Sequence, residues 1–179
     1  MNDAEDRSAR PGPRRPSFRG LACRPMSTRP SRSQPWLRFG PRPLAVVLAV
    51  VGLDQATKAA VCAAWPPGQG KHLTVIPGLF DFVHVRNTGA AWGMFTGQTL
   101  LLAIVSVLVL AVLVLRFRTM AGGRRERGVA LSLIAGGIVG NLIDRLIRGE
   151  VVDFLLVYYR SFHWPAFNIA DSAITCGVA

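Results

Sequence analysis

Long apolar runs divide this chain into candidate membrane-spanning helices. The first run holds 22 residues, about 33 Å of helix, which is enough to cross a bilayer. The last holds 12 residues, about 18 Å, and is too short to cross. The pattern therefore predicts spans at about 44–65, 97–115, 129–148 and 168–179, the fourth of them incomplete.

Between the first two spans the chain holds short runs of β-branched and aromatic residues. One of them, 79–85, follows a Pro-Gly pair at 77–78. Runs of this kind, bounded by turn residues, are typical of β-strands, so 68–96 is predicted to form a small sheet outside the membrane. Residues 116–128 are predicted to be a polar connection, and residues 149–167 a loop rich in aromatic side chains.

The composition agrees with a membrane protein and excludes two other classes. The chain is 50% hydrophobic and 17% charged, whereas soluble domains carry about 25% charged residues. A net charge of +11 would suggest nucleic-acid binding on a polar chain. On this apolar chain we expect no nucleic-acid partner. The odd number of cysteines, with two of the three in apolar segments, excludes a secreted disulfide scaffold.

The arginines predict the orientation of the spans. Ten of them precede Leu44, and five more lie between positions 116 and 127. Because cytoplasmic segments of membrane proteins are enriched in Lys and Arg, the N-terminus and this connection are predicted to be cytoplasmic. The Arg- and Pro-rich residues 1–43 cannot bury enough apolar surface to fold, so they are predicted to be a disordered arm. Residues 44–179 then form the membrane-embedded domain.

Two of the predicted spans carry charged residues in their outer halves. Asp54 and Lys58 are four residues apart on one helix face and can pair, either as a structural ion pair or as support for a functional site. The third span contains Asn141, Asp144 and Arg145. Ionisable residues within a span are functional candidates, although Asp144 and Arg145 could also form a simple salt bridge.

Two more aspartates lie at the same predicted membrane level. Asp153 is flanked by apolar residues, and Asp171 opens the last helix with Asn168 on the same face. Two carboxylates held close together share a proton. One can then act as general base on water while its protonated partner acts as acid, which suits attack on an amide. Ion-translocating proteins also use carboxylate pairs, so the spacing alone leaves the reaction open.

One further polar cluster precedes the second span and includes Asn87 and Gly89. A turn explains this cluster as well as a substrate contact does. The histidines at positions 72, 84 and 163 are not linked by a metal-ligand spacing, so no metal site is expected.

Five short motifs occur in one order along residues 44–175, and together they resemble the lipoprotein signal peptidase (signal peptidase II) family. Their order and number make the resemblance more specific than any one of them. The motifs are Asp54-Gln55-Ala56-Thr57-Lys58, Asn87-Thr88-Gly89-Ala90-Ala91-Trp92-Gly93, Gly140-Asn141-Leu142-Ile143-Asp144-Arg145, Val151-Val152-Asp153-Phe154 and Phe167-Asn168-Ile169-Ala170-Asp171-Ser172.

The resemblance implies an all-α integral membrane bundle of four transmembrane helices, the last one truncated here, with a small external β-cradle. It also implies an aspartyl endopeptidase of the bacterial inner membrane that cuts the signal peptide from prolipoproteins, just before a cysteine carrying diacylglycerol. The catalytic dyad would be Asp153 and Asp171, on the outer side of the membrane. The matching supporting or substrate-contacting positions are Asp54, Lys58, Asn87, Gly89, Asn141, Asp144, Arg145 and Asn168.

The same resemblance implies no cofactor. The expected partners are the diacylglyceryl-modified prolipoprotein and membrane lipids, and we expect the chain to act as a monomer. Two alternatives differ in class from this peptidase. One is an ion-coupled transporter that uses the charged residues as a relay. The other is a non-catalytic binder of lipidated precursors, because the short last helix could fail to hold Asp171 against Asp153.

Overall fold

The described part of this computed structural model, residues 41–65 and 72–179, lies within the unit Gln34–Ala179. Three of its helices are long and apolar enough to cross a membrane, and a fourth is apolar but has ten residues. These lengths confirm the predicted helical membrane bundle with one short helix. The helices are α1 (Pro41–Ala64), α2 (Thr99–Ala121), α3 (Arg125–Ile147) and α4 (Ile169–Val178).

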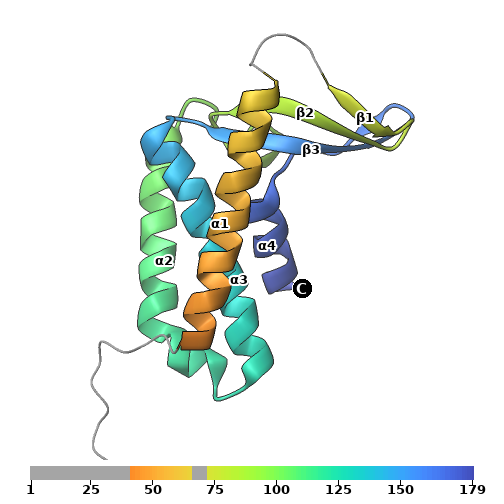
Figure 1. Ribbon diagram of the computed structural model, residues 1–179. Helices are drawn as coiled ribbons and strands as arrows, with labels where there is room; N and C mark the ends of the chain where they lie inside the picture. The colour runs from red at the N-terminus through yellow and green to blue at the C-terminus, as the bar shows by residue number, and fades with distance from the viewer. Residues whose placement is uncertain (1–40, 66–71) are drawn as a thin grey trace, which may run out of the picture. The chain divides into compact units, whose positions relative to one another are not determined.

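Helix α3 is the central element of the bundle. It packs against α1, α2 and α4, and Figure 1 shows these helices side by side. Close approach of α4 depends on Gly137, since a Cβ there would lie 2.7 Å from Ile174 Cγ1 and would also overlap the carbonyl oxygen of Ala170. The glycine-rich stretch of α3 therefore brings the N-terminal turn of α4 against the polar face of α3.

An antiparallel four-stranded sheet lies at one end of the bundle (Figure 1). Its order follows the chain, and Asp153 on the third strand lies opposite Val85 on the second. The predicted sheet within 68–96 is confirmed by the first two strands. The strands are β1 (Leu73–Ile76), β2 (Phe80–Asn87), β3 (Val151–Tyr159) and β4 (Phe162–His163).

The prediction of a loop over 149–167 is wrong, because this segment contains β3 and β4. A continuous apolar run such as 151–157 has no period that separates a strand from other structures. Residues 151–157 form a strand because they pair with β2, from Phe80↔Val157 to Asn87↔Val151.

The predicted span limits also need correction at the helix ends on either side of the α2–α3 connection. Helix α2 continues beyond residue 115 to Ala121, and α3 begins at Arg125 rather than 129. Arginine is a good helix former, so the helix does not end where the apolar run ends. Helix α2 ends at Ala121, where the next residue, Gly122, adopts the left-handed conformation with φ 57° and caps the helix.

The start of the first span differs in the same way. Helix α1 begins at Pro41 rather than at residue 44. Proline is tolerated in the first turn of a helix because its missing N–H would have no partner there. The rest of the predicted disordered arm, up to residue 40, lies outside the described residues.

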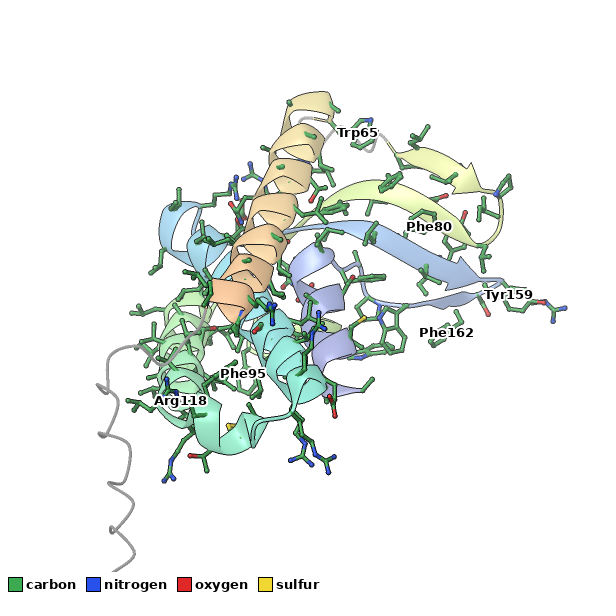
Figure 2. The ribbon with its side chains drawn as sticks, turned by 60° about the horizontal axis from the view of Figure 1, so that its bottom comes forward. Trp65, Phe80, Phe95, Arg118, Tyr159 and Phe162 are labelled. Atoms are coloured by element: carbon green, nitrogen blue, oxygen red, sulfur yellow. The ribbon has the colours of Figure 1, made fainter. Side chains whose placement is uncertain are left out.

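A buried apolar cluster fixes the sheet onto the helices. Val61 of α1 packs with Val152 and Phe154 of β3, and Phe82 stacks on Phe154 with ring centroids 6.4 Å apart. Since Asp153 lies between two of these anchored residues, its backbone position is set by the cluster. Next to the turn that joins β3 to β4, the side chains of Tyr159 and Phe162 are exposed (Figure 2).

Candidate active site

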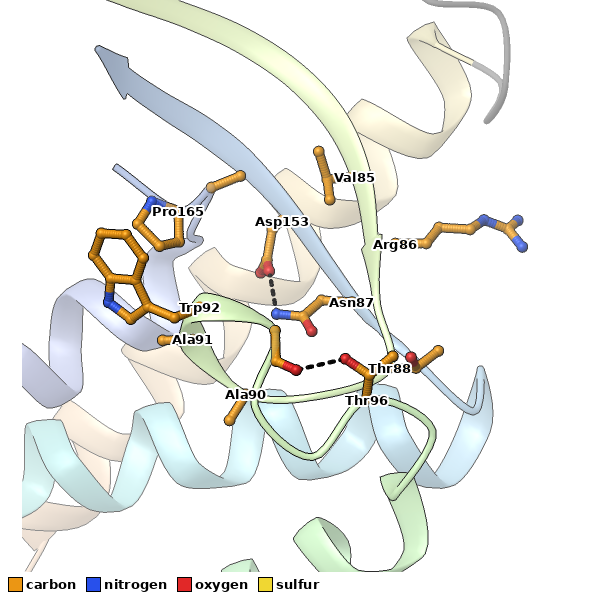
Figure 3. Close-up of a pocket in the computed structure, with 12 residues that line it drawn as sticks. Val85, Arg86, Asn87, Thr88, Ala90, Ala91, Trp92, Thr96, Asp153 and Pro165 are labelled. Atoms are coloured by element: carbon orange, nitrogen blue, oxygen red, sulfur yellow. Dashed lines mark hydrogen bonds between the residues drawn. The ribbon is translucent and has the colours of Figure 1, made fainter. Parts of the chain in front are cut away.

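Asp153 is a buried carboxylate that two amide groups hold in place. Its Oδ2 accepts a hydrogen bond from Asn87 Nδ2 at 2.9 Å, and its Oδ1 accepts one from Asn168 Nδ2 at 2.7 Å. Asn87 is one strand away, diagonal to Asp153 on the same face of the sheet, because side chains alternate along strands. Figure 3 shows the Asn87 side chain pointing at the carboxylate.

Asp171 is fixed by the start of α4 and by α3. Its Oδ2 accepts the backbone N–H of Asn168 at 3.1 Å while Asn168 Oδ1 accepts the backbone N–H of Asp171, a reciprocal capping box. Its Oδ1 accepts a hydrogen bond from Asn141 Nδ2 at 2.7 Å. Capping therefore accounts for part of the role of Asp171, and the contact with α3 adds a second anchor.

The amides of Asn141 and Asn168 join the two aspartates. Asn168 Nδ2 donates to Asp153 and lies 3.1 Å from Asn141 Oδ1. The other end of the Asn141 amide donates to Asp171. The two carboxylates are thus held by one continuous chain of amides from α3 and the start of α4.

A fully buried charge cluster supports these amides. Lys58 Nζ lies 2.8 Å from Asp54 Oδ2 and 2.9 Å from Asp144 Oδ2, and all three side chains are 0% exposed. Lys58 also donates to Asn141 Oδ1 at 3.0 Å. The predicted Asp54–Lys58 pair is confirmed. The alternative pairing of Asp144 with Arg145 is wrong, since the ion-pair partners of Asp144 are Lys58 and Arg148.

The two acidic members of this cluster also bind the backbone beside each candidate catalytic aspartate. Asp54 Oδ1 accepts the N–H of Ala170, the residue before Asp171, at 2.9 Å. Asp144 Oδ2 accepts the N–H of Val152, the residue before Asp153, at 3.2 Å. Because Lys58 bridges the two acids, it links both backbone segments to α1.

Burial changes the acidity of Asp153. Desolvation raises the pKa of its carboxyl to about 7, and the nearby charge of Asp171 acts in the same direction. The hydrogen bonds from Asn87 and Asn168 oppose this shift, as does the charge of Lys58. Asp153 can therefore hold or release a proton near neutral pH, which a general acid or base requires.

Arg145 and Gly89 lie on another side of the site, between α3 and the loop after β2. Arg145 Nη2 donates to Gly89 O at 3.3 Å, and Gly89 N–H donates to Asn87 Oδ1 at 2.9 Å. A Cβ on Gly89 would lie 2.6 Å from Met94 O, so the loop folds back on itself only with glycine here. This turn orients Asn87 toward Asp153, so the interpretation of the segment as a turn is confirmed, and a contact with substrate stays a prediction.

Two cavities meet at Asp153. The larger cavity, of about 690 Å³, is lined by Asp171 and Arg145 and continues along α4 to Cys176. The smaller, of about 250 Å³, is shown in Figure 3 and is lined by the end of β2 and the loop after it, including Thr88 and Thr96. The residues that line both are Asn87, Ala90, Ala91, Asp153, Pro165 and Ala166.

Two polar residues next to the buried charges, Gln55 and Arg148, were not among the predicted site residues. Gln55 Nε2 lies 3.1 Å from Asp54 Oδ2 and 3.2 Å from Asp144 Oδ1, and Arg148 donates to Asp144 Oδ1. Arg148 is four residues after Asp144 on the same helical face, a spacing that could have indicated the contact. Over residues 41–65 and 72–179, no three His, Cys, Asp or Glu side chains are grouped so that they could hold a metal ion.

The fold and this site define a multi-pass membrane protein in which a buried carboxylate, Asp153, and a half-buried one, Asp171, line one cavity. A family model described as Signal peptidase (SPase) II matches residues 46–179. The chain belongs to the signal peptidase II family, which confirms the resemblance seen in its motifs and makes it a peptidase of bacterial membranes.

Individual relatives agree with this assignment. A protein named Lipoprotein signal peptidase from Geobacter sulfurreducens is 45% identical over 138 residues, which cover 75% of this chain and 85% of that protein. One of the same name from Geobacillus kaustophilus is 41% identical over 133 residues, covering 74% and 85%. A solved structure described as a bacterial membrane enzyme has a TM-score of 0.72 and 36% identity, and covers 78% of this chain and 84% of its own.

Proposed function

We propose that this chain removes signal peptides from diacylglyceryl-modified prolipoproteins by aspartate-activated water. The observation that carries the proposal is the placement of Asp153 and Asp171, which line one cavity and are joined through the amides of Asn141 and Asn168. Family membership supports the peptidase class, and the paired carboxylates support an aspartic mechanism within it.

The pair holds one proton when the substrate is bound. The ionised carboxylate removes a proton from water as the water oxygen bonds to the scissile carbonyl carbon, and the protonated carboxyl donates to the carbonyl oxygen. The amide C–N bond then breaks as the nitrogen takes a proton from the dyad. The products are the signal peptide with a free carboxylate and the lipoprotein with a free amine on its lipidated cysteine.

The cavities suggest how the substrate lies. The scissile bond must reach Asp153, where the two cavities meet. The larger cavity follows α4 along the apolar part of the bundle, so it suits the apolar signal peptide and the acyl chains. The smaller cavity lies against the loop after β2 and suits the polar segment that follows the cysteine.

The short α4 does not favour a non-catalytic binder. Its first turn, which carries Asp171, is held by Asn141 and by Asp54 through the N–H of Ala170. These contacts lie within the first three residues of the helix. The position of Asp171 therefore has support that does not depend on the far end of α4.

The proposal includes a location. We place the chain as a monomer in the bacterial inner membrane, with the residues before α1 and the α2–α3 connection in the cytoplasm and the dyad on the outer side. A reagent that cannot cross the membrane should then modify a cysteine introduced at Ser161 but not one at Arg124, in a background without native cysteines. The reverse labelling would contradict this orientation.

Cleavage of a defined precursor tests the activity. Purified chain in detergent is mixed with a prolipoprotein that carries diacylglycerol on its cysteine, and with the same precursor unmodified, and the products are measured by mass spectrometry. We expect cleavage directly before the cysteine, in the modified precursor only. The matched control is Asp81→Asn, which alters a carboxylate on the sheet that accepts a hydrogen bond from the Tyr158 hydroxyl, away from the dyad. This variant should cleave at the normal rate.

Each other outcome would remove part of the proposal. Equal cleavage of the unmodified precursor would remove the lipid requirement. Absence of cleavage by folded chain would remove the catalytic assignment, and retained binding of the lipidated precursor would then identify a binder.

A further inference from the structure

Arg148, at the end of α3, lies on the outer edge of the buried charge cluster. Its side chain is 31% exposed, whereas those of Asp54, Lys58 and Asp144 are fully buried. It forms an ion pair with Asp144 Oδ1 through Nη1, and the same nitrogen lies 3.4 Å from Gln55 Oε1. Arg148 therefore joins the cluster to the surface.

The charges of the cluster balance only when Arg148 is counted. Asp54 and Asp144 contribute two negative charges, and Lys58 contributes one positive charge. A buried net charge is costly unless it is paired, and Arg148 supplies the second cation. Arg145 is directed elsewhere, since its guanidinium donates to the carbonyl oxygens of Gly89 and Asn141.

Arg148 also sets the orientation of the Gln55 amide. Because Arg148 donates to Gln55 Oε1, the amide nitrogen must face the opposite way. There it lies within 3.2 Å of both Asp54 Oδ2 and Asp144 Oδ1. The arginine and the amide together hold the two acids at a fixed separation from the outer side, while Lys58 bridges them from within.

Both acids bind backbone groups next to the dyad. Asp144 holds the N–H of Val152, the neighbour of Asp153, and Asp54 holds the N–H of Ala170, the neighbour of Asp171. We propose that Arg148, acting with Gln55, is a positioning residue that sets the spacing of Asp153 and Asp171 through these two acids. This inference rests on the proposed function, because it concerns the rate of that reaction.

Steady-state kinetics of Arg148→Ala test the inference. We expect kcat to fall about tenfold, less than the roughly 100-fold that a misplacement of a full 1 Å costs, with KM within about twofold of the unmodified chain. Arg148→Lys restores the charge and should recover most of the rate. Because the side chain is partly exposed, millimolar guanidinium chloride should also restore Arg148→Ala, whereas sodium chloride should not.

Two further variants complete the experiment. Arg160→Ala removes an exposed arginine that lies over Tyr159 at the end of the sheet, and it should cleave at the normal rate. Gln55→Leu keeps every charge and serves if Arg148→Ala does not fold, with an expected loss in kcat of about threefold.

Distinct results separate failure of this inference from failure of the proposed function. A full rate in Arg148→Ala, or in Gln55→Leu if the alanine variant does not fold, overturns the role of Arg148. A loss that neither lysine nor guanidinium reverses also overturns it, because a missing cation would then not be the cause. If the unmodified chain itself does not cleave, the proposed function falls and this inference falls with it.

Discussion

Replacing Lys58 with methionine removes the cation that contacts Asp54, Asp144 and Asn141. The volume is nearly kept, so the main effect is electrostatic. Breaking a buried ion pair by removing one partner costs about 3–5 kcal/mol, because the other charge stays buried without compensation. For a chain of this size, where 1 kcal/mol corresponds to about 2–4 °C, we expect the thermal midpoint to fall by about 10 °C.

A second substitution can restore the balance of charge. In Lys58→Met the remaining charges of Asp54, Asp144 and Arg148 sum to one negative charge, and adding Asp54→Asn brings the sum to zero while the Asp144–Arg148 ion pair remains. An asparagine oxygen can still accept the N–H of Ala170. We therefore expect the double variant to regain more than half of the lost stability, whereas Lys58→Met with the distant Asp81→Asn should regain none.

Thermal unfolding in detergent, followed by tryptophan fluorescence at pH 7, measures these differences. Cleavage by Lys58→Met should be reduced but present, since Lys58 does not line either cavity at the dyad. The reasoning is refuted by a midpoint within about 3 °C of the unmodified chain, which corresponds to about 1 kcal/mol. It is also refuted if the double variant is no more stable than the single one.

Two other predictions concern pH and packing. The pKa of Asp153 is about 7 in the folded chain against 3.8 for a free carboxyl, so the folded state binds the proton more tightly. Stability should therefore fall as the pH rises from about 4 to 7, and thermal midpoints should show a shallower fall in Asp153→Asn. In Gly137→Ala the new Cβ would overlap Ala170 O of α4, which we expect to cost about 1–3 kcal/mol and to slow cleavage. Gly52→Ala, whose Cβ would meet nothing within 4 Å, is the matched control and should keep its midpoint and rate, and equal effects of both alanines would contradict the packing argument.

Local spacing predicted part of the site correctly. The i, i+4 rule gave the Asp54–Lys58 pair, and both residues are in contact on α1. The apolar spans gave the three long helices, although arginines extend α2 and α3 beyond their apolar runs. Properties that depend on neighbours along one helix can be inferred from one sequence.

Contacts between distant segments could not be predicted in this way. Lys58 of α1 forms an ion pair with Asp144 of α3, and Asn168, at the start of α4, donates a hydrogen bond to Asp153 of β3. The wrong Asp144–Arg145 alternative came from sequence adjacency, whereas side chains at i and i+1 of a helix point in different directions. Similarly, β3 was missed because its partner strand lies more than sixty residues earlier, as in the pair Arg86↔Val152.

The most direct test of the account compares Asp153→Asn and Asp171→Asn with the unmodified chain. Cleavage of the diacylglyceryl-modified precursor is measured at equal amounts of folded protein, with thermal midpoints taken in parallel. Since acid–base catalysis by a positioned group contributes about 10²–10⁴-fold, and the two carboxyls act as one unit, we expect each variant to lose at least about a thousandfold in rate. Cleavage by either folded variant within about tenfold of the unmodified chain would contradict the assignment of Asp153 and Asp171 as the catalytic pair.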